Sequence, residues 1–269
     1  MRQRTSFTLV PKDSENLDLY DEHEEIVSVR GKRVKRRGIF LLPNLLTTAS
    51  LFSGFYSIIS ATQGDFISAG MAIFAAQLFD GLDGRVARLT NSQSKFGAQY
   101  DSLCDVVSFG LAPAISIFLW GLNSLGQAGW IFSFLYVAAA ALRLARFNTN
   151  FGSEDAYFKG LPSPVAGATL AYYVWAMSSV GIQGEALGVF LTVISACLTG
   201  LLAILMVINI PYYSFKEIEL KKRVPFFAML VVVFIFALIA IDPPLILVSC
   251  ALLYTLSGPT IWILKSLRK

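Results

Sequence analysis

Long apolar segments are the feature that most restricts how this chain can fold. Windows of about 20 apolar residues, the length that a helix needs to cross a bilayer, lie near 39–60, 65–88, 98–121, 127–148, 164–182, 186–209, 223–241 and 243–264. Backbone groups in hydrocarbon must bond within their own segment, which favours helices. Of 269 residues, 55% are hydrophobic and 15% charged, unlike a soluble domain. The sequence predicts an all-α, polytopic membrane bundle of about eight transmembrane helices.

The loops between these segments alternate in charge. Basic residues gather in the N-terminal segment, in the C-terminal tail and in the loops at 89–97, 143–163 and 214–223. Almost no charge falls in the loops at 61–64, 122–126, 183–186 and 242–244. Because basic loops remain in the cytoplasm, both termini are predicted to be cytoplasmic. The net charge of +4 belongs to this pattern and gives no indication of nucleic-acid binding.

Composition divides the chain into three parts. Residues 1–38 form a cytosolic segment in which an acidic, mobile tail at 1–27 precedes a basic run from Arg30 to Arg37. This run either binds anionic headgroups or only orients the first span. Residues 39–209 form a core of six helices, and residues 210–269 add two helices and a cytosolic C-terminus. Prolines and glycine in the last segment could break its helix: Pro243, Pro244, Gly258 and Pro259.

Four aspartates interrupt two of the apolar segments. Asp80 and Asp83 are three residues apart, and Asp101 and Asp105 are four apart, so each pair projects from one helix face. Carboxylates in hydrocarbon cost several kcal/mol each, and the four are expected to share cations. Ligation by oxygen alone suits Mg²⁺ or Mn²⁺, and two such ions form a clamp for phosphoryl transfer. The alternative is an ion or proton pathway, as in a transporter.

The spacing around these aspartates resembles a family signature. The pattern D-x2-D-G-x2-A-R-x8-G-x3-D-x3-D of the CDP-alcohol phosphotransferases is matched by Asp80, Asp83, Gly84, Ala87, Arg88, Gly97, Asp101 and Asp105. The flanking sequences resemble the membrane-embedded phosphatidylserine synthases of that family: FDGLDGRVARLT, SKFGAQYDSLCDVVSFGLAPA, LRLARFN and KGLPSP. The resemblance extends over residues 39–165.

This resemblance implies a reaction of phospholipid synthesis. CDP-diacylglycerol would donate its phosphatidyl group to the hydroxyl of L-serine, with CMP leaving, in an enzyme that uses two divalent cations, Mg²⁺ or Mn²⁺. Another acceptor, such as glycerol 3-phosphate or inositol, is the alternative. The implied metal ligands are Asp80, Asp83, Asp101 and Asp105, and Asp105 would also be the catalytic base. The implied contacts to CDP-diacylglycerol are Asn44, Gly84, Ala87, Arg88, Ser94 and Gly97. Relatives are typically homodimers.

Three basic residues after the signature are candidates for binding the acceptor. Arg143 and Arg146 share a helix face at i, i+3, and a guanidinium suits the carboxylate of serine. A lipid phosphate is an alternative ligand, and a role as topology charges is another. Lys159 and the GLPSP turn either close over the acceptor or only connect two spans. The loop charges place the aspartates at cytosolic helix ends, in an integral protein of a bacterial or archaeal-type cell membrane.

Overall fold

The computed structural model describes most of the chain. The described residues are 25–29, 32–36, 41–90, 92–149, 158–183, 187–212, 237 and 240–267. The chain divides into two units, Met1–Gly38 and Ile39–Lys269. The acidic tail predicted for 1–27 lies almost wholly outside the described residues, as does most of the span predicted at 223–241.

A short hairpin is the described part of the first unit. Strand β1 (Glu25–Val29) pairs with β2 (Lys32–Arg36) in antiparallel register, so that Glu25 faces Arg36 and Val29 faces Lys32. β-Branched residues favour strands, and a two-residue connection is the commonest hairpin loop. No strand is predicted here from the sequence, because the clustered positive charge of the basic run obscures its alternation.

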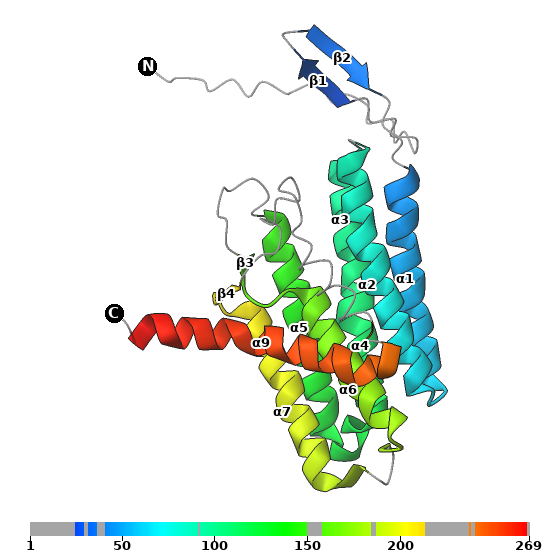
Figure 1. Cartoon of the computed structure of the whole chain (residues 1–269), viewed down its shortest axis with the longest axis vertical. Helices are drawn as coiled ribbons and strands as arrows, with labels where there is room; N and C mark the ends of the chain where they lie inside the picture. The colour runs from blue at the N-terminus through cyan, green and yellow to red at the C-terminus, as the bar shows by residue number, and fades with distance from the viewer. Residues whose placement is uncertain are drawn as a thin grey trace, which may run out of the picture. The chain divides into compact units, whose positions relative to one another are not determined.

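The second unit is built from helices (Figure 1). In chain order they are α1 (Leu41–Thr62), α2 (Phe66–Leu89), α3 (Lys95–Asp105), the π-helix η1 (Val106–Leu111), α4 (Ala112–Trp120), the 3-10 helix η2 (Leu122–Leu125), α5 (Gln127–Thr149), α6 (Ser163–Ser179), α7 (Gly188–Val207) and α9 (Pro243–Leu267). Two short strands, β3 (Phe158–Lys159) and β4 (Pro211–Tyr212), pair antiparallel beside them.

Helix lengths agree with the predicted membrane character. Within the described residues, six helices are long and apolar enough to cross a membrane: Leu41–Thr62, Phe66–Leu89, Phe96–Trp120, Gln127–Thr149, Gly188–Val207 and Pro243–Leu264. Helix α6 has 17 residues and occupies the window predicted at 164–182. These helices indicate an integral membrane protein, and the predicted helical class is confirmed.

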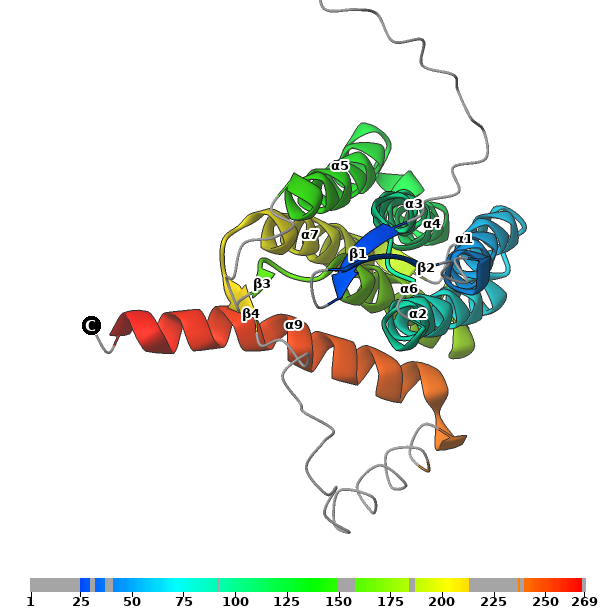
Figure 2. The same ribbon diagram turned by 90° about the horizontal axis from the view of Figure 1, so that it is seen from above.

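The last helix differs from the others in direction. Figures 1 and 2 show α9 crossing the direction of α5, α6 and α7, whereas α1 and α2 run along the bundle. The break considered at Gly258 and Pro259 does not occur, because α9 continues through both residues. Pro259 has no N–H for the carbonyl of Thr255, four residues earlier. The Tyr212 hydroxyl donates a hydrogen bond of 3.0 Å to that carbonyl instead, which compensates for the missing bond.

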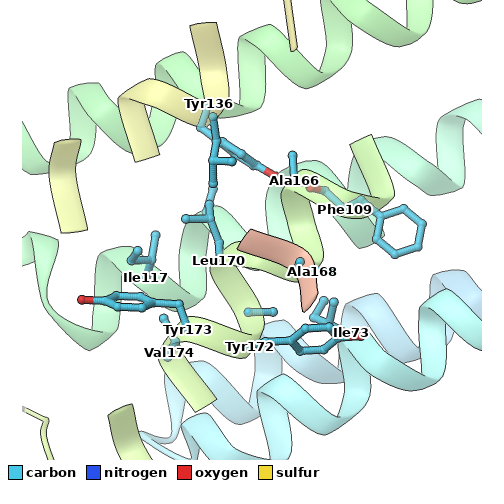
Figure 3. Close-up of a cluster of buried hydrophobic side chains, with 14 of the residues drawn as sticks. Ile73, Phe109, Ile117, Tyr136, Ala166, Ala168, Leu170, Tyr172, Tyr173 and Val174 are labelled. Atoms are coloured by element: carbon cyan, nitrogen blue, oxygen red, sulfur yellow. Dashed lines mark hydrogen bonds between the residues drawn. The ribbon is translucent and has the colours of Figure 1, made fainter. Parts of the chain in front are cut away.

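Helix α6 supplies much of the buried core. Figure 3 shows its residues Ala166, Ala168 and Leu170 among side chains from neighbouring helices, including Tyr136 of α5. Helix α6 packs against α2, α4 and α9. Helix α2, which carries Asp80 and Asp83, and the segment η1–α4, which follows Asp105, are therefore held against a common central helix.

A π-helical turn follows Asp105 directly. The predicted single helix at 98–121 contains η1, in which the Ala112 N–H bonds the Val107 carbonyl. Pro113 cannot donate to the carbonyl of Phe109, four residues earlier. The Tyr136 hydroxyl donates to that carbonyl at 3.0 Å. π-Helical turns occur frequently at functional sites, and here the turn begins where the acidic signature ends.

Candidate metal centre and active site

Three aspartates from two helices meet at one place. Asp80 on α2 and Asp101 and Asp105 on α3 each offer a carboxylate oxygen, and these oxygens lie within 4.8 Å of one another. Asp105 is only 8% exposed, and the other two are half-buried. Carboxylates this close repel one another unless a cation or protons intervene. An all-oxygen donor set of this kind fits a divalent cation such as Mg²⁺ or Mn²⁺.

The fourth aspartate has a protein partner. Asp83 is 5% exposed, and its Oδ2 accepts a hydrogen bond of 2.6 Å from Oγ1 of Thr47 on α1. It lies outside the group of three oxygens described above, although its charge interacts with Asp80 and Asp101. Thr47 is not among the site residues predicted from the sequence. Its position three residues after Asn44, on the same face of the first span, is the signal that could have found it.

The two candidate acceptor arginines have different partners. Arg143 is 7% exposed, its NH1 donates to Ser163 Oγ at 3.0 Å, and its charge interacts with Asp105. Its buried Nε has no hydrogen-bond partner among the described residues. Arg146 donates from NH1 to the Val207 carbonyl at 3.1 Å and to Asn209 Oδ1 at 2.9 Å. Arg143 therefore faces the aspartates and α6, whereas Arg146 ties α5 to the end of α7.

Three of the predicted nucleotide contacts lie together at the start of α3. Ser94 is the N-cap of α3, and its Oγ accepts the N–H of Gly97 at 2.9 Å. A Cβ atom at Gly97 would lie 3.1 Å from Ser94 Oγ and 3.5 Å from Asn44 Oδ1. The first helix and the start of the third thus meet beside the predicted nucleotide site.

The other three predicted nucleotide contacts lie on α2, beyond Asp83. A Cβ atom at Gly84 would meet nothing within 4 Å, and Gly84 and Arg88 are exposed while Ala87 is partly exposed. Arg88 Nε donates to the Gly84 carbonyl at 2.9 Å. This face of α2 leaves open space next to the acidic signature.

The KGLPSP segment is tied to three helices. Lys159 pairs through its backbone with Pro211, and its side chain lies outside the described residues. The Gly160 N–H donates to the Ile210 carbonyl at 2.9 Å, and the Leu161 N–H donates to the Leu205 carbonyl at 2.9 Å. The last two residues of the segment have partners on α5 and α2.

Arg143 and Gln77 are these two partners, and their hydrogen bonds bring the beginning of α6 next to the aspartates. Ser163 accepts the hydrogen bond from Arg143, and Gln77 Nε2 donates to the Pro164 carbonyl at 3.1 Å. Gln77 lies three residues before Asp80 on α2, and its side-chain oxygen accepts a hydrogen bond from Tyr172. Gln77 is not among the site residues predicted from the sequence, although its i, i+3 spacing to Asp80 places it on the same helix face.

A helical membrane protein with a carboxylate cluster on two neighbouring helices is the class that fold and site define. A model of the CDP-alcohol phosphatidyltransferase family matches residues 40–200, more than half of the chain. The chain belongs to the CDP-alcohol phosphatidyltransferase family, and the resemblance inferred from the aspartate signature is confirmed.

Similar curated proteins come from bacteria, archaea and yeast. A CDP-diacylglycerol–serine O-phosphatidyltransferase of Helicobacter pylori is 36% identical over 228 residues, covering 84% of this chain and 92% of that protein. The archaetidylserine synthase of Methanothermobacter thermautotrophicus is 40% identical over 134 residues, 49% of this chain and 57% of that protein. A Saccharomyces cerevisiae CDP-diacylglycerol–serine O-phosphatidyltransferase is 38% identical over 138 residues, 46% of this chain and 49% of that protein.

Proposed function

We propose that this protein transfers the phosphatidyl group of CDP-diacylglycerol to L-serine, forming phosphatidylserine and CMP. The observation that carries the reaction class is the meeting of Asp80, Asp101 and Asp105 in a chain of this family. The choice of serine is supported by the names of the similar proteins, of which the Helicobacter pylori enzyme is matched over 92% of its length.

The acidic cluster is the proposed site of two divalent cations, Mg²⁺ or Mn²⁺. Asp80, Asp101 and Asp105 hold them, and Asp83, positioned by Thr47, completes the ligand set. When bound, divalent cations neutralise the diphosphate and stabilise the charge of an in-line displacement.

Asp105 is the proposed catalytic base. It accepts the proton of the serine hydroxyl as the hydroxyl oxygen forms a bond to the phosphorus that carries the lipid, and the bond from that phosphorus to CMP breaks. Its burial and its place in the group of three carboxylates support this role. The guanidinium of Arg143 is the proposed partner of the serine carboxylate.

The donor is proposed to lie along the cytosolic ends of the first three helices. Contacts to CDP-diacylglycerol are assigned to Asn44, Gly84, Ala87, Arg88, Ser94 and Gly97. A liponucleotide has its acyl chains in the bilayer and its nucleotide toward water, so a site at helix ends meets both parts.

The proposed topology has eight spans and cytoplasmic termini, because the basic loops alternate with uncharged ones. The division into a segment at 1–38, a core at 39–209 and an extension at 210–269 is part of this proposal, as are a homodimer and a cytoplasm-facing site in the cell membrane. Helix α9 is the last span of this proposal, and Figure 1 shows it crossing the direction of α5, α6 and α7.

CMP release by the purified protein in detergent tests this function. The assay supplies CDP-diacylglycerol with serine, glycerol 3-phosphate or inositol, with Mg²⁺ or Mn²⁺ and after exhaustive chelation. We expect release only with serine and a divalent cation. Release with another acceptor would change the substrate assignment, and release that survives chelation would overturn the metal-assisted chemistry. An ion transporter that uses the same aspartates would release no CMP.

A further inference from the structure

The packing of α6 on α2 changes in character along its length. Figure 2 shows the two helices side by side. At one end a Cβ atom at Gly70 would lie 2.6 Å from Cβ of Trp175, so the backbones approach closely there. Further along, Phe74 packs on Tyr172, with ring centroids 6.3 Å apart. The contact becomes polar where it reaches the acidic cluster, and there Gln77 of α2 is the residue that meets α6.

Gln77 uses both ends of its amide to hold α6. Its Nε2 donates a hydrogen bond of 3.1 Å to the Pro164 carbonyl in the first turn of α6, and its Oε1 accepts a hydrogen bond from the hydroxyl of Tyr172. Tyr172 is buried. Because an amide has a donor end and an acceptor end, the tyrosine fixes which end faces Pro164. One side chain thus holds the start of α6 against α2, three residues before Asp80.

Ser163 connects this point to Arg143. It precedes Pro164 directly and is 0% exposed, and its Oγ accepts a hydrogen bond of 3.0 Å from NH1 of Arg143 on α5. The Nε of Arg143 is buried and has no hydrogen-bond partner in the part of the chain that the structure describes. Buried polar groups are generally hydrogen-bonded, so this N–H is available for a ligand. Gln77 and Arg143 therefore hold adjacent residues of α6.

We infer that Gln77 is a positioning residue for the acceptor alcohol: it fixes the start of α6, and through Ser163 it fixes the Arg143 guanidinium relative to α2. The inference rests on the proposed function. A guanidinium recognises a carboxylate through the plane of its N–H groups, and fixing that plane before the acceptor binds reduces the entropy lost on binding. A bond that served only to join α2 and α6 would contribute to stability but not to the affinity for the acceptor.

Steady-state kinetics of Gln77→Met test this inference. Methionine has a similar length, but it can neither donate to the Pro164 carbonyl nor replace the amide oxygen that Tyr172 bonds. We expect the KM for serine to rise roughly fivefold, the size of effect that one lost hydrogen bond between neutral groups produces. The KM for CDP-diacylglycerol and the Mg²⁺ concentration for half-maximal activity should stay at the wild-type level, because neither the aspartates nor the proposed donor contacts lie on α6.

Tyr172→Phe is a milder second variant, for use if Gln77→Met does not fold in detergent. It keeps Gln77 and removes the hydroxyl that orients the amide, so the KM for serine should rise, but by less than in Gln77→Met. Tyr173→Phe is the matched control at the next residue. It removes a hydroxyl that lies 2.9 Å from Ser195 Oγ, between α6 and α7, and both KM values should stay at the wild-type level.

A double-mutant cycle with Ser163→Ala tests the route from Gln77 to Arg143. Ser163→Ala alone should raise the KM for serine at least about tenfold, because it removes a hydrogen bond to a charged group. In that background Gln77→Met should have no further effect on the KM for serine, because residues that act through one chain of contacts are not additive.

An unchanged KM for serine in Gln77→Met, or in Tyr172→Phe if the methionine variant does not fold, would overturn the inference. Equal rises in both KM values or full additivity with Ser163→Ala would also overturn it. If the wild-type protein uses another acceptor, the same comparison is made with that acceptor. An unchanged KM then overturns the role of Gln77 alone, whereas CMP release that depends on no acceptor overturns the proposed function itself.

Discussion

Thr47 on α1 donates a hydrogen bond of 2.6 Å to Asp83 on α2, and both side chains are buried. The bond joins residues 36 positions apart in the sequence. It occupies one oxygen of Asp83 and orients the carboxylate. The first helix thereby controls the geometry of a site whose carboxylates all come from the second and third helices.

Replacing Thr47 with Val keeps the side-chain shape and removes the hydroxyl. We expect the divalent cation concentration for half-maximal activity to rise at least tenfold, the lower end of the range for residues that orient metal ligands. Titration of activity with Mg²⁺ or Mn²⁺ measures this half-maximal concentration. Thr47→Ser restores the donor and should return the titration close to wild type, and an unchanged midpoint in Thr47→Val would show that this bond does not orient a metal ligand.

Asp105→Asn preserves the size of the side chain but removes the proposed base. Turnover should fall at least about 100-fold, as is typical when a general base is lost, while affinity for CDP-diacylglycerol is largely retained. Single-turnover CMP release and equilibrium binding of the donor separate the two effects. Turnover within about threefold of wild type, well below the usual effect, would exclude Asp105 as the base. Asp65→Asn, beyond the other end of α2, is the control and should have full activity.

The different surroundings of Arg143 and Arg146 predict different effects of lysine. Arg143→Lys should raise the KM for serine with little change in the KM for CDP-diacylglycerol, because lysine keeps the charge but loses the planar fork. Arg146→Lys should leave both constants near wild type and lower the unfolding temperature, because Arg146 bonds Val207 and Asn209. A rise in the donor KM alone would assign Arg143 to the lipid diphosphate.

Asp65 caps α2, and this cap is expected to make a pH-dependent contribution to the stability of the protein. Its Oδ1 accepts the Ser68 N–H at 3.0 Å, and the hydrogen bonds from Ser68 lower the pKa of Asp65 below its usual value. Because the folded pKa is the lower one, the contribution is present at neutral pH and is lost as the pH falls through the folded pKa.

Asp65→Ala should reduce the free energy of unfolding by about 1 kcal/mol at neutral pH, with a smaller reduction at a pH below the folded pKa. Unfolding in detergent at both pH values measures the change. Asp65→Asn retains a capping oxygen and should be close to wild type at neutral pH, and a loss equal to that of alanine would contradict the cap.

Local patterns in the sequence predicted most of the helices and the centre of the site. Hydropathy windows located α1, α2, α5 and α7 within a few residues, because a span in hydrocarbon depends on length and apolar content. The i, i+4 spacing of Asp101 and Asp105 placed both on one face of α3, where Asp80 meets them. These features depend on helical periodicity and on residues near one another in the chain.

Tertiary contacts decided which partner each side chain has. Arg143 and Arg146 lie on the same general face of α5, but at about 100° per residue their side chains are offset by about 60° around the helix axis. Arg143 therefore bonds Ser163, whereas Arg146 bonds Asn209. Similarly, Pro113 removes a helical donor within α4, and only the folded arrangement brings Tyr136 to the Phe109 carbonyl.

The sequence by itself determined the helical membrane class, the family and the cluster of acidic residues, because each depends on composition or on short-range spacing. The tertiary structure decided that Thr47 orients Asp83 and that Tyr212 carries α9 through Pro259. These relationships join residues 36 and 43 positions apart. A periodic pattern specifies which face of a helix is polar, but only packing in three dimensions specifies what that face meets.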